Sequence, residues 1–553
     1  MPRISVCRAG QKPQTLDCPP GQSLYRALAD AGLMDAPCNG MGKCGKCRVH
    51  ILESSPAVQM GEDGFFTQDE LLCGWRLACL HTVTGDVTVE LAAQEKVSSI
   101  VSGGLLRPCV GPPLLSKRPT LQGDTEVLRA GQVVCTEPGD TSKRLYGAAI
   151  DIGTTTVVAT LVDLRTGEEV ASASCVNSQK AFGQDVMTRI QHAAQPGGAN
   201  ALQGAVLQDL RDLLGHLYAH NPAGVGPADL YEMTIGANNT MIHLLLHADP
   251  AGMGRTPYHP SLHGAQTRTA AQLGLPAADA CQVYCLPAVS AFVGGDITAG
   301  VLACALEKND KTVLFIDIGT NGEMVLSRGS HLCACSCAAG PALEGMNIRC
   351  GMRAADGAVE DVELSGQDGD LRARLTVIGD AAPRGLCGSG LLSAIARLRG
   401  QGVIHPSGRL ISHPLVQTGP DGKKRVVLDA AHGIVLTQND IRQVQLAKGA
   451  ILSGIQTMMR FSGVTPYGID EVLVAGQFGA HLKVESLTGA GIIPAELGPK
   501  VRYVGNTSKS GALLCLLSQD ERKRAEEIAG RVDYIELSSL EGYEKVFVKA
   551  MQF

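Results

Sequence analysis

The sequence predicts a multidomain protein, with an α+β domain at the amino end and a larger α/β domain after it. Two observations lead to this fold class. Three cysteines fall within CNGMGKCGKC (38–47), among segments that read as short strands. The segment YGAAIDIGTTTVVATLVD (146–163) recurs 166 residues later as TVLFIDIGTNGEMVLSRG (312–329), each copy reading as strand, turn and strand. One repeat at this distance predicts two similar subdomains rather than a solenoid, whose units recur every ~20–50 residues.

Composition and charge narrow the class of protein. The 553 residues are 44% hydrophobic and 18% charged, which permits large cores and argues against global disorder. The formal charge is −6, and the 48 Lys and Arg are scattered along the chain, so the sequence does not indicate a basic surface for binding nucleic acid. No apolar run is typical of a signal peptide, and no stretch approaches the ~18 apolar residues of a membrane span. We therefore expect a cytoplasmic protein whose 19 cysteines are reduced, as metal ligands or buried thiols.

Three regions follow one another along the chain. Residues 1–93 are predicted to form short strands around a small helix. The expected elements are a hairpin (3–10 with 14–18), a helix (23–33), a strand (46–52) and a second hairpin (81–91) about Gly85 and Asp86. Residues 94–145 are predicted to be a linker, because glycine and proline interrupt the pattern. Residues 146–553 alternate strands and helices with glycine-rich joints, which is typical of an α/β domain.

The cysteines of the first region are predicted to hold a 2Fe-2S cluster. Cys38, Cys44 and Cys47 have the spacing C-x5-C-x2-C. A zinc ribbon normally needs two C-x2-C pairs, and a 4Fe-4S ferredoxin needs C-x2-C-x2-C; the chain has neither. A 2Fe-2S site takes three ligands from one loop and a fourth from far along the chain, and x5 is one longer than the plant-type x4. Cys79, between an apolar segment and the predicted hairpin, is the expected fourth ligand, and Cys73 is then a buried bystander. The alternative is a zinc site or inert cysteines.

The glycines between these cysteines suit a cluster loop. Gly40, Gly42 and Gly45 permit positive φ and let backbone N–H groups approach sulfide and thiolate. Together with RLACLHTVTGDVTVEL (76–91), the stretch resembles the β-grasp 2Fe-2S ferredoxin domain that opens the bacterial reductive activators of corrinoid enzymes. By itself, this domain would fit many electron-transfer proteins.

The repeated DIGT segments are predicted to bind the phosphates of a nucleotide. Their backbone N–H groups and threonine hydroxyls can bind phosphate, while the aspartate at the strand end can hold hydrated Mg²⁺. DEVLVAGQFGAHL (470–482) adds a strand that runs into glycines, where backbone can lie against a nucleoside. No P-loop pattern is present. The residues predicted to bind ATP and Mg²⁺ are Asp151, Gly153, Thr154, Thr155, Thr156, Asp317, Gly319, Thr320, Asn321, Gly322, Gly476 and Gly479. The alternative is that these segments are only tight hairpins.

These three segments resemble the two phosphate turns and the adenosine turn of the actin, Hsp70 and sugar-kinase superfamily. The resemblance implies a duplicated ribonuclease H-like fold. In kinases of that superfamily, a comparable Gly-Gly-Asp opens a helix just before the second phosphate turn, and the aspartate is the general base. The resemblance therefore implies that Asp296, in AFVGGDITAGVLACAL (291–306), orients or deprotonates an attacking water. The alternative is that Asp296 is a helix N-cap.

Further segments resemble the corrinoid-activator family rather than kinases. They are NSQKAFGQDVMTRI (177–190), TIGANNTMIHLLL (234–246), CAAGPALEGMNIRCGMRAADGAVE (337–360), GLCGSGLLSAIA (385–396), LTQNDIRQVQLAKGAI (436–451) and GAGIIP (489–494). Members of the family usually carry a longer middle domain before the first phosphate turn. Here only residues 108–145 fill that place, so residues 94–145 read as a linker with a shortened middle segment.

Two other groups are expected to be structural. Asn238, Asn239 and His243 are predicted to be helix-capping or satisfied core residues. A second group of cysteines is predicted to consist of small buried residues rather than a second cluster. It comprises Cys333, Cys335, Cys337, Cys350 and Cys387.

The resemblance implies an ATP-dependent reductive activase. The 2Fe-2S domain would take an electron from a cellular low-potential donor and pass it to a methyltransferase-associated corrinoid protein, reducing inactive Co(II) to Co(I). Plant-type 2Fe-2S potentials lie near −400 mV, and the cobalt couple lies lower. ATP binding and hydrolysis would therefore favour the state in which transfer occurs. A homodimer is among the expected assemblies. The alternatives are a small-molecule kinase with a redox-sensing ferredoxin domain and a non-catalytic, ATP-regulated electron carrier.

Overall fold

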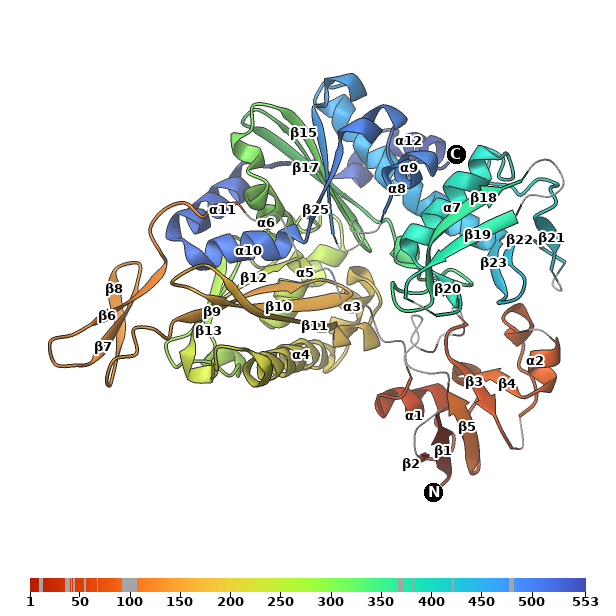
Figure 1. Cartoon of the computed structure of the whole chain (residues 1–553), viewed down its shortest axis with the longest axis horizontal. Coiled ribbons are helices and arrows are strands. Elements are labelled where there is room, and N and C mark those ends of the chain that lie inside the picture. Colours follow the sequence, from red (N-terminus) through yellow and green to blue (C-terminus); the bar gives the residue numbers. More distant parts are fainter. Residues whose placement is uncertain are drawn as a thin grey trace.

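The computed structural model describes most of the chain. Its described residues are 1–8, 13–34, 40, 42, 45–53, 56–66, 68–91, 107–366, 372–379, 381–419, 422–476 and 482–553. Three predicted site residues, Cys38, Cys44 and Gly479, lie outside them. Figure 1 shows a small amino-terminal domain beside a larger body that contains two sheets.

The amino-terminal domain is a five-stranded mixed sheet. In order across the sheet, its strands are β2 (Gln14–Asp17), β1 (Arg3–Cys7), β5 (Val87–Leu91), β3 (Arg48–Ile51) and β4 (Trp75–Leu77). The predicted hairpin forms, since β1 pairs antiparallel with β2, and β1 also pairs in parallel with β5. Helix α1 (Leu24–Asp30) packs its apolar side chains into the domain core, and α2 (Gln68–Leu72) precedes β4. This is the expected β-grasp arrangement.

The second predicted hairpin of this domain does not form. Only β5 is a strand within 81–91. The residues before it bond instead to the segment that leads into α1: Gly21 N donates to Val83 O at 2.8 Å, and Leu24 N donates to His81 O at 2.9 Å. The backbone groups of residues 81–83 thus bond to partners distant in sequence. The alternation of apolar and polar residues by itself had predicted that they would pair within a local hairpin.

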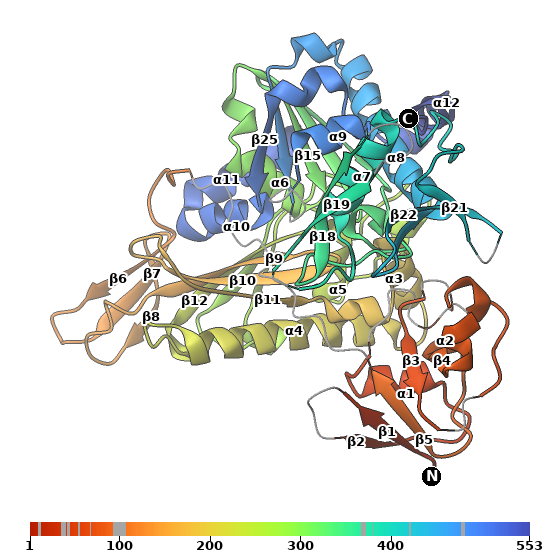
Figure 2. The ribbon, with the colours of Figure 1, turned by 45° about the vertical axis from the view of Figure 1, so that its right-hand side comes forward.

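An antiparallel sheet follows where an irregular linker was expected. Its strands are β6 (Leu115–Pro119), β7 (Thr125–Arg129) and β8 (Gln132–Glu137). Figures 1 and 2 show this sheet projecting from the body. Two ion pairs attach it: Arg107 Nη2 lies 2.6 Å from the buried Glu521, and Arg129 Nη2 lies 2.8 Å from the buried Glu232. Its glycines therefore make turns between strands rather than an unstructured connection.

Two six-stranded sheets form the body, in agreement with the predicted duplication. The first runs β11 (Glu169–Val176), β10 (Thr156–Asp163), β9 (Tyr146–Ile152), β12 (Leu230–Ala237), β14 (Gln282–Cys285) and β13 (Gln266–Thr269). The second runs β25 (Val501–Gly505), β24 (Glu471–Ala475), β15 (Thr312–Ile318), β16 (Gly322–Arg328), β17 (His331–Cys337) and β26 (Asp533–Tyr534). Apart from β13 and β26, the topology is the same. In each sheet three antiparallel strands are followed by two parallel ones on the other side of the first strand.

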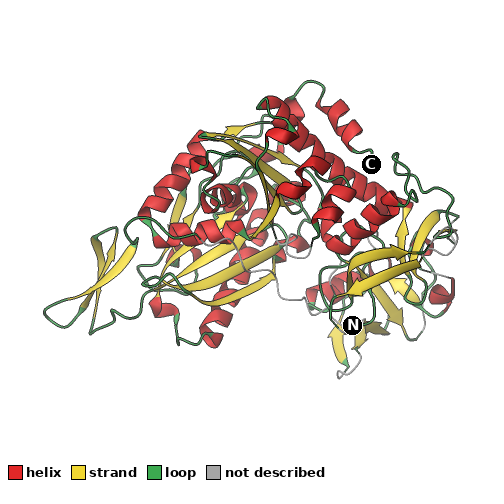
Figure 3. Ribbon diagram, turned by 45° about the horizontal axis from the view of Figure 1, so that its top comes forward, coloured by secondary structure: helices red, strands yellow, loops and turns green. Residues whose placement is uncertain are grey.

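Helices cover both sheets (Figure 3). Helices α6 (Gly295–Ala303) and α10 (Thr507–Leu517) share one core with residues of both sheets, and an added Cβ at Gly511 would lie 2.3 Å from Ala299 O. Helix α4 (Gly198–His220) packs on the first sheet and α8 (Gln438–Phe461) on the second. The remaining helices are α3 (Val186–Ala193), α5 (Asn239–Leu245), α7 (Gly388–Gly400), α9 (Val484–Gly489), α11 (Gln519–Arg531) and α12 (Tyr543–Ala550). None of the helices in the described ranges is long and apolar enough to cross a membrane.

Two small sheets lie between β17 and α8 in the sequence. One consists of β19 (Arg372–Val377), β18 (Ala358–Ser365) and β20 (Gly385–Leu386), and the other of β21 (Val416–Thr418), β22 (Lys424–Asp429) and β23 (Ile434–Thr437). In both Figure 1 and Figure 2, the amino-terminal domain lies next to the end of the body that carries β20 and β23. The insertion thus separates the amino-terminal domain from the second sheet.

Candidate functional site

Two of the four predicted cluster ligands are described, and their sulfur atoms meet. Cys47 Sγ and Cys79 Sγ lie 3.2 Å apart. A disulfide would bring them to about 2.05 Å. Two thiolates bound tetrahedrally to one metal ion at ~2.3 Å would lie ~3.8 Å apart. The pair is therefore too far apart for a disulfide and close to the spacing of two ligands on one iron.

Buried polar contacts hold this pair in place. Ala78 N donates to Cys47 O at 2.8 Å. The carboxylate of Glu62, which is fully buried, accepts from Leu77 N at 2.7 Å and contacts His81 Nε2 at 3.0 Å. These bonds fix the segment that carries Cys79 to the strand that begins after Cys47. Such supporting bonds orient metal ligands in general.

Cys73 lies outside the core, which corrects its predicted burial. The residue is exposed, and its carbonyl oxygen contacts His50 Nε2 at 2.7 Å. It directly follows α2, on which every residue is at least partly exposed. The thiol of Cys79 contacts Cys47 and that of Cys73 does not in the described contacts, so Cys79 stays the predicted fourth ligand.

The glycines of the cysteine loop have the predicted backbone conformation. Gly40, Gly42 and Gly45 all have φ between +65° and +84°. At Gly45 an added Cβ would lie 2.4 Å from Phe65 Cδ1, and at Gly40 it would lie 2.8 Å from Tyr25 Cδ1. Both the dihedral angle and the lack of space thus require glycine at these positions.

The two predicted phosphate turns face each other across the body. Thr155 Oγ1 lies 3.3 Å from Thr320 Oγ1. Both hydroxyls donate to one carboxylate: Thr155 to Glu344 Oε2 at 3.1 Å and Thr320 to Glu344 Oε1 at 2.9 Å. Each turn is closed by a backbone bond, from Gly153 N to Thr156 O and from Gly319 N to Asn321 O, both at 2.9 Å. Two hydroxyl-bearing turns thus converge on one position, where a carboxylate accepts hydrogen bonds from both.

Buried side chains brace the first turn. Arg189 Nη2 donates to Thr154 O at 2.6 Å, and Asn177 Nδ2 donates to Gly153 O at 2.8 Å. Asn238 Nδ2 donates to Thr154 Oγ1 at 3.1 Å, and its Oδ1 caps α5 by accepting from Met241 N at 3.0 Å. The capping role predicted for Asn238 is confirmed, and its second bond adds a contact with the turn.

Four carboxyl groups gather beside the two turns. Burial raises the pKa of Asp317 to about 7, and the negative charge of Asp151 adds to this shift. Burial raises the pKa of Asp296 to about 7, and the negative charges of Asp317 and Asp151 add smaller shifts in the same direction. Burial also raises the pKa of Glu323 well above its usual value, with Asp296 and Asp317 contributing. Mutual repulsion of their negative charges thus contributes to the raised pKa values of these carboxyl groups, and a cation bound beside them would oppose that repulsion.

The arrangement fits a hydrated magnesium ion that arrives with a nucleotide. No three Asp, Glu, His or Cys side chains in the described ranges are placed to hold a bare metal ion. Mg²⁺ keeps several of its waters and usually takes one or two carboxylates together with substrate phosphates. Asp151 and Asp317 lie one residue before the ends of the equivalent strands β9 and β15, and both keep some solvent exposure, as such a contact requires.

Asp296 is not the N-cap of its helix. Gly294 occupies the N-cap position of α6, and Asp296 follows in the first turn. Its Oδ1 accepts from Ile297 N at 2.9 Å, which leaves the second oxygen for other partners. The alternative that Asp296 is the N-cap is therefore wrong. The role of Asp296 as a general base stays a prediction.

Gly476 brings the third predicted segment to the second phosphate turn. It has φ of +97°, and an added Cβ would lie 2.7 Å from Ile318 O and 2.9 Å from Asp317 Oδ1. Ala475 pairs with Asp317 in the sheet. The backbone thus passes directly over the strand end that carries Asp317.

Sequence reasoning missed two polar residues at this site. Asn506 caps α10 and its Nδ2 donates to Asp151 Oδ2 at 2.8 Å. Asn506 lies between β25 and α10, and Asp296 lies in the corresponding place after β14, at the start of α6. Comparison of the two repeated halves could therefore have revealed Asn506. Glu344 ends the short helix Pro341–Glu344 between Gly340 and Gly345. Its only sequence signal is an acidic residue between glycines.

Four of the five cysteines in the second group are buried as predicted, whereas Cys350 is partly exposed. Cys333, Cys335 and Cys337 are buried along β17 in the core of the second sheet. Cys387 Sγ donates to Val359 O at 3.2 Å, and Cys350 Sγ accepts from Val435 N at 3.5 Å. These side chains fill space and bond to backbone rather than converging.

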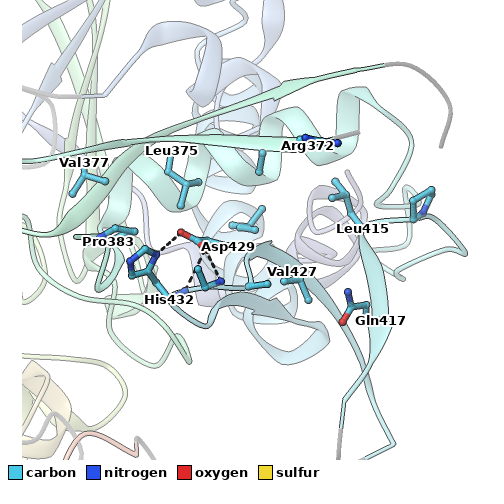
Figure 4. A pocket seen from close by; sticks show the side chains of 14 residues that line it. Arg372, Leu375, Val377, Pro383, Leu415, Gln417, Val427, Asp429 and His432 are labelled. Atoms are coloured by element: carbon cyan, nitrogen blue, oxygen red, sulfur yellow. Dashed lines mark hydrogen bonds and ion pairs between the residues drawn. The ribbon is translucent and has the colours of Figure 1, made fainter. Parts of the chain in front are cut away.

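A separate groove lies between the two small sheets (Figure 4). Its volume is about 680 Å³, and Leu375, Val377, Leu415 and Val427 give it an apolar lining. At one end, His432 Nδ1 contacts Asp429 Oδ2 at 2.8 Å. No sequence pattern indicated this groove, because its walls come from strands far apart in the chain.

The fold and sites define a class: a 2Fe-2S ferredoxin domain joined to an ATP-binding domain of the actin, Hsp70 and sugar-kinase superfamily. Family models agree with this class. A 2Fe-2S iron-sulfur cluster binding domain matches residues 8–84, and the middle region of RACo matches 146–309. The C-terminal domain of RACo, described as the ASKHA domain, matches 311–553.

Relatives of known name identify the family. The chain is 34% identical over 413 residues to corrinoid activation enzyme RamQ of Eubacterium limosum, covering 72% of this chain and 68% of that protein. It is 24% identical to the [Co(II) methylated amine-specific corrinoid protein] reductase of Methanosarcina barkeri, covering 74% and 77%. A solved structure named reductive activator for corrinoid,iron-sulfur protein aligns with TM-score 0.71 and 31% identity, over 100% of this chain and 98% of that one. The chain belongs to the family of reductive activators of corrinoid proteins.

Proposed function

We propose that this protein is an ATP-dependent reductive activator that passes one electron from its 2Fe-2S cluster to a corrinoid protein. The observation that carries the proposal is the meeting of Thr155, Thr320 and Glu344 in a chain whose ferredoxin domain brings Cys47 and Cys79 together. A phosphate clamp and an electron carrier in one chain suit a transfer that needs ATP. The names of the relatives supply the acceptor.

The electron count is simple. A low-potential cellular donor gives one electron to the ferredoxin domain, and that domain gives one electron to Co(II) of the corrinoid substrate, which becomes Co(I). The cluster, when bound, supplies one-electron transfer at a potential near −400 mV for a plant-type site. Cys38, Cys44, Cys47 and Cys79 would hold it. Glu62 would keep the segment of Cys79 in register with that of Cys47.

The ATP site would work by positioning. The hydroxyl groups of Thr155 and Thr320 would donate hydrogen bonds to the terminal phosphates from opposite sides. Asp151 and Asp317 would hold the waters of Mg²⁺. Asp296, with its pKa raised to about 7 by burial, Asp317 and Asp151, would accept a proton from the attacking water as ADP and phosphate form.

The proposal retains three further predictions. The chain would divide into a ferredoxin domain (1–93), a segment (94–145) that includes the sheet of β6, β7 and β8, and the ATP-binding domain (146–553). The corrinoid partner would belong to a methyl-transfer system. A homodimer would be among its assemblies.

One experiment tests the function directly. The protein with its cluster is reduced, mixed with a Co(II) corrinoid protein, and followed by the absorbance of Co(I) with and without Mg·ATP. We expect Co(I) only when ATP is present, together with faster ATP hydrolysis when the Co(II) protein is added. ATP consumption that ignores the corrinoid protein would indicate the kinase alternative. Cobalt reduction that proceeds equally without ATP would indicate the non-catalytic carrier.

A further inference from the structure

A lysine next to a predicted cluster ligand connects the ferredoxin domain to the ATP-binding domain. Lys46 Nζ donates to Gly351 O at 2.5 Å and to Arg349 O at 3.3 Å. Lys46 directly precedes Cys47. The carbonyls lie more than 300 residues away in the sequence, in the loop between Glu344 and β18. The ferredoxin domain is thus attached beside its own cluster loop.

That loop is closely packed against the residue that follows Glu344. An added Cβ at Gly351 would lie 2.0 Å from Gly345 O, so the two backbones touch. An added Cβ at Gly345 would lie 2.4 Å from Met352 O. No flexible side chain separates the two strands of the loop. A displacement of Glu344 and Gly345 therefore moves the carbonyls that Lys46 contacts.

Backbone hydrogen bonds also anchor the loop next to the carbonyls that Lys46 contacts. Asp440, at the start of α8, accepts from Arg349 N at 2.8 Å and is buried. Met352 N donates to Leu386 O at 2.8 Å. These bonds keep the loop in one arrangement while Glu344 stays between the phosphate turns. The carbonyls that Lys46 contacts thus lie between these anchors on α8 and β20 and the contact of Gly351 with Gly345, through which a change at Glu344 would reach them.

Glu344 and a nucleotide compete for the same donors. The hydroxyls of Thr155 and Thr320 both point at the Glu344 carboxylate. A phosphate bound by these hydroxyls would place negative charge on the position of that carboxylate. Burial raises the pKa of Glu344, because its charged form is costly at this site, and a phosphate beside it would add to that cost. Either the carboxylate or the phosphate has to leave.

We propose that Glu344 and a nucleotide phosphate exclude each other from the position between Thr155 and Thr320, and that the loop 344–351 holds the ferredoxin domain through Lys46 while Glu344 occupies that position. Nucleotide binding displaces Glu344, moves the loop and releases the domain. The inference rests on the proposed function only for the location of the nucleotide. It assigns Glu344 as a competitor of phosphate and Lys46 as a positioning residue.

Release would give the ferredoxin domain a bounded reach. The last described residue before the connection is Leu91, and Arg107 is anchored on Glu521 by two hydrogen bonds of 2.8 and 2.6 Å. Leu91 and Arg107 bound the connection, so the released domain stays joined to the body.

The test uses thermodynamic reciprocity. If nucleotide weakens docking, then loss of docking strengthens nucleotide binding by the same factor. We would measure the affinity of the cluster-bearing protein for Mg·AMPPNP by calorimetry, together with its radius of gyration by X-ray scattering. Lys46→Met removes the contact far from the nucleotide. Arg3→Met is the matched control, because it removes an exposed cation of the same domain that pairs with Asp86.

We expect Lys46→Met to bind Mg·AMPPNP about 5-fold or more tightly than wild type, with Arg3→Met unchanged. We expect the radius of gyration of wild type to rise with nucleotide, and that of Lys46→Met to be raised without it. Glu344→Gln should also tighten binding, since the amide carries no charge against the phosphate. Unchanged affinity in Lys46→Met, or weaker binding in Glu344→Gln, would overturn the inference. Wild-type protein that fails to bind Mg·AMPPNP would instead contradict the proposed ATP site itself.

Discussion

The hydroxyl oxygens of Thr155 and Thr320 lie 3.3 Å apart, although 165 residues separate them in the chain. Each hydroxyl ends a hairpin turn that follows the first strand of its own sheet. The duplicated topology brings the two turns together, because equivalent strands place their ends at a shared boundary. A ligand between them would be held by both halves of the body at once.

The two threonines should contribute similarly to nucleotide affinity. We expect Thr155→Val and Thr320→Val each to weaken Mg·ATP binding by about 10- to 100-fold, since a hydrogen bond to a charged group contributes ~1.5–3 kcal/mol. Calorimetry with a non-hydrolysable analogue would measure this. Thr160→Val is the matched control: it makes the same change in β10, where Thr160 bonds to Ser172 at 3.0 Å. Equal losses in all three variants would contradict the clamp.

Removal of either strand-end aspartate should stop hydrolysis. We expect Asp151→Asn and Asp317→Asn to reduce ATP turnover by about 100-fold or more, because each loses charge that positions Mg²⁺ and the phosphates. Phosphate release would measure the rate. Asp310→Asn changes an exposed carboxylate just before β15 and should leave the rate unaltered. Full activity in both site variants would remove the basis for the ATP site.

The acidic group should make stability depend on pH in a defined direction. A carboxyl group whose folded-state pKa is raised holds its proton more tightly when folded, so its stabilising effect is present at low pH and lost as pH rises. For Asp317 and Asp296, with an ordinary pKa of 3.8 raised to about 7, the loss falls between these values.

Thermal unfolding of the magnesium-free protein would measure this dependence. We expect the Tm of Asp317→Asn to gain a few °C on wild type as pH rises from 5 to 8, because the amide cannot ionise. Asp310→Asn should follow wild type throughout. A constant difference between Asp317→Asn and wild type would contradict the charge repulsion inferred for the group.

Two cysteines six residues apart should behave oppositely. Cys79 contacts Cys47 at 3.2 Å, whereas Cys73 is exposed. We expect Cys79→Ser to lose the visible absorbance of the 2Fe-2S cluster while Mg·ATP binding persists, and Cys73→Ser to retain both. Absorbance together with iron content would decide. A stable cluster in Cys79→Ser, or its loss in Cys73→Ser, would reverse the ligand assignment.

Gly476 should be required for function beyond its backbone conformation. Gly476→Ala and Gly463→Ala both place a side chain at positive φ, which costs about 1–2 kcal/mol. Only at Gly476 would the new Cβ press on Asp317 Oδ1, at 2.9 Å, whereas Gly463 has open space. We expect a larger loss of Tm in Gly476→Ala, whose Cβ would also lie 2.7 Å from Ile318 O, and a loss of ATP hydrolysis in that variant alone. Hydrolysis at the wild-type rate in Gly476→Ala would show that the glycine does not support the site.

Local patterns predicted the chemistry well where one short segment carries it. The C-x5-C-x2-C spacing, the positive-φ glycines and the strand–DIGT–strand units depend on neighbours in the chain, and the last two appear in the structure as expected. The alternation of apolar and polar residues gave wrong predictions where a segment found its hydrogen-bond partner far away in the sequence. Residues 81–86 bond to the segment before α1 instead of folding back, and glycines near 123 and 131 join the strands of a sheet.

The sequence by itself determined which residues could bind a cluster and phosphates, because those motifs are read from spacing and from strands that end in glycine-rich turns. Only the tertiary structure decided that Glu344 joins the two turns, that Asn506 reaches Asp151, and that Lys46 meets the loop after Glu344. The physical reason is that these contacts join segments brought together by sheet order and domain packing. A hydrogen bond across hundreds of residues leaves no periodicity in the chain that makes it.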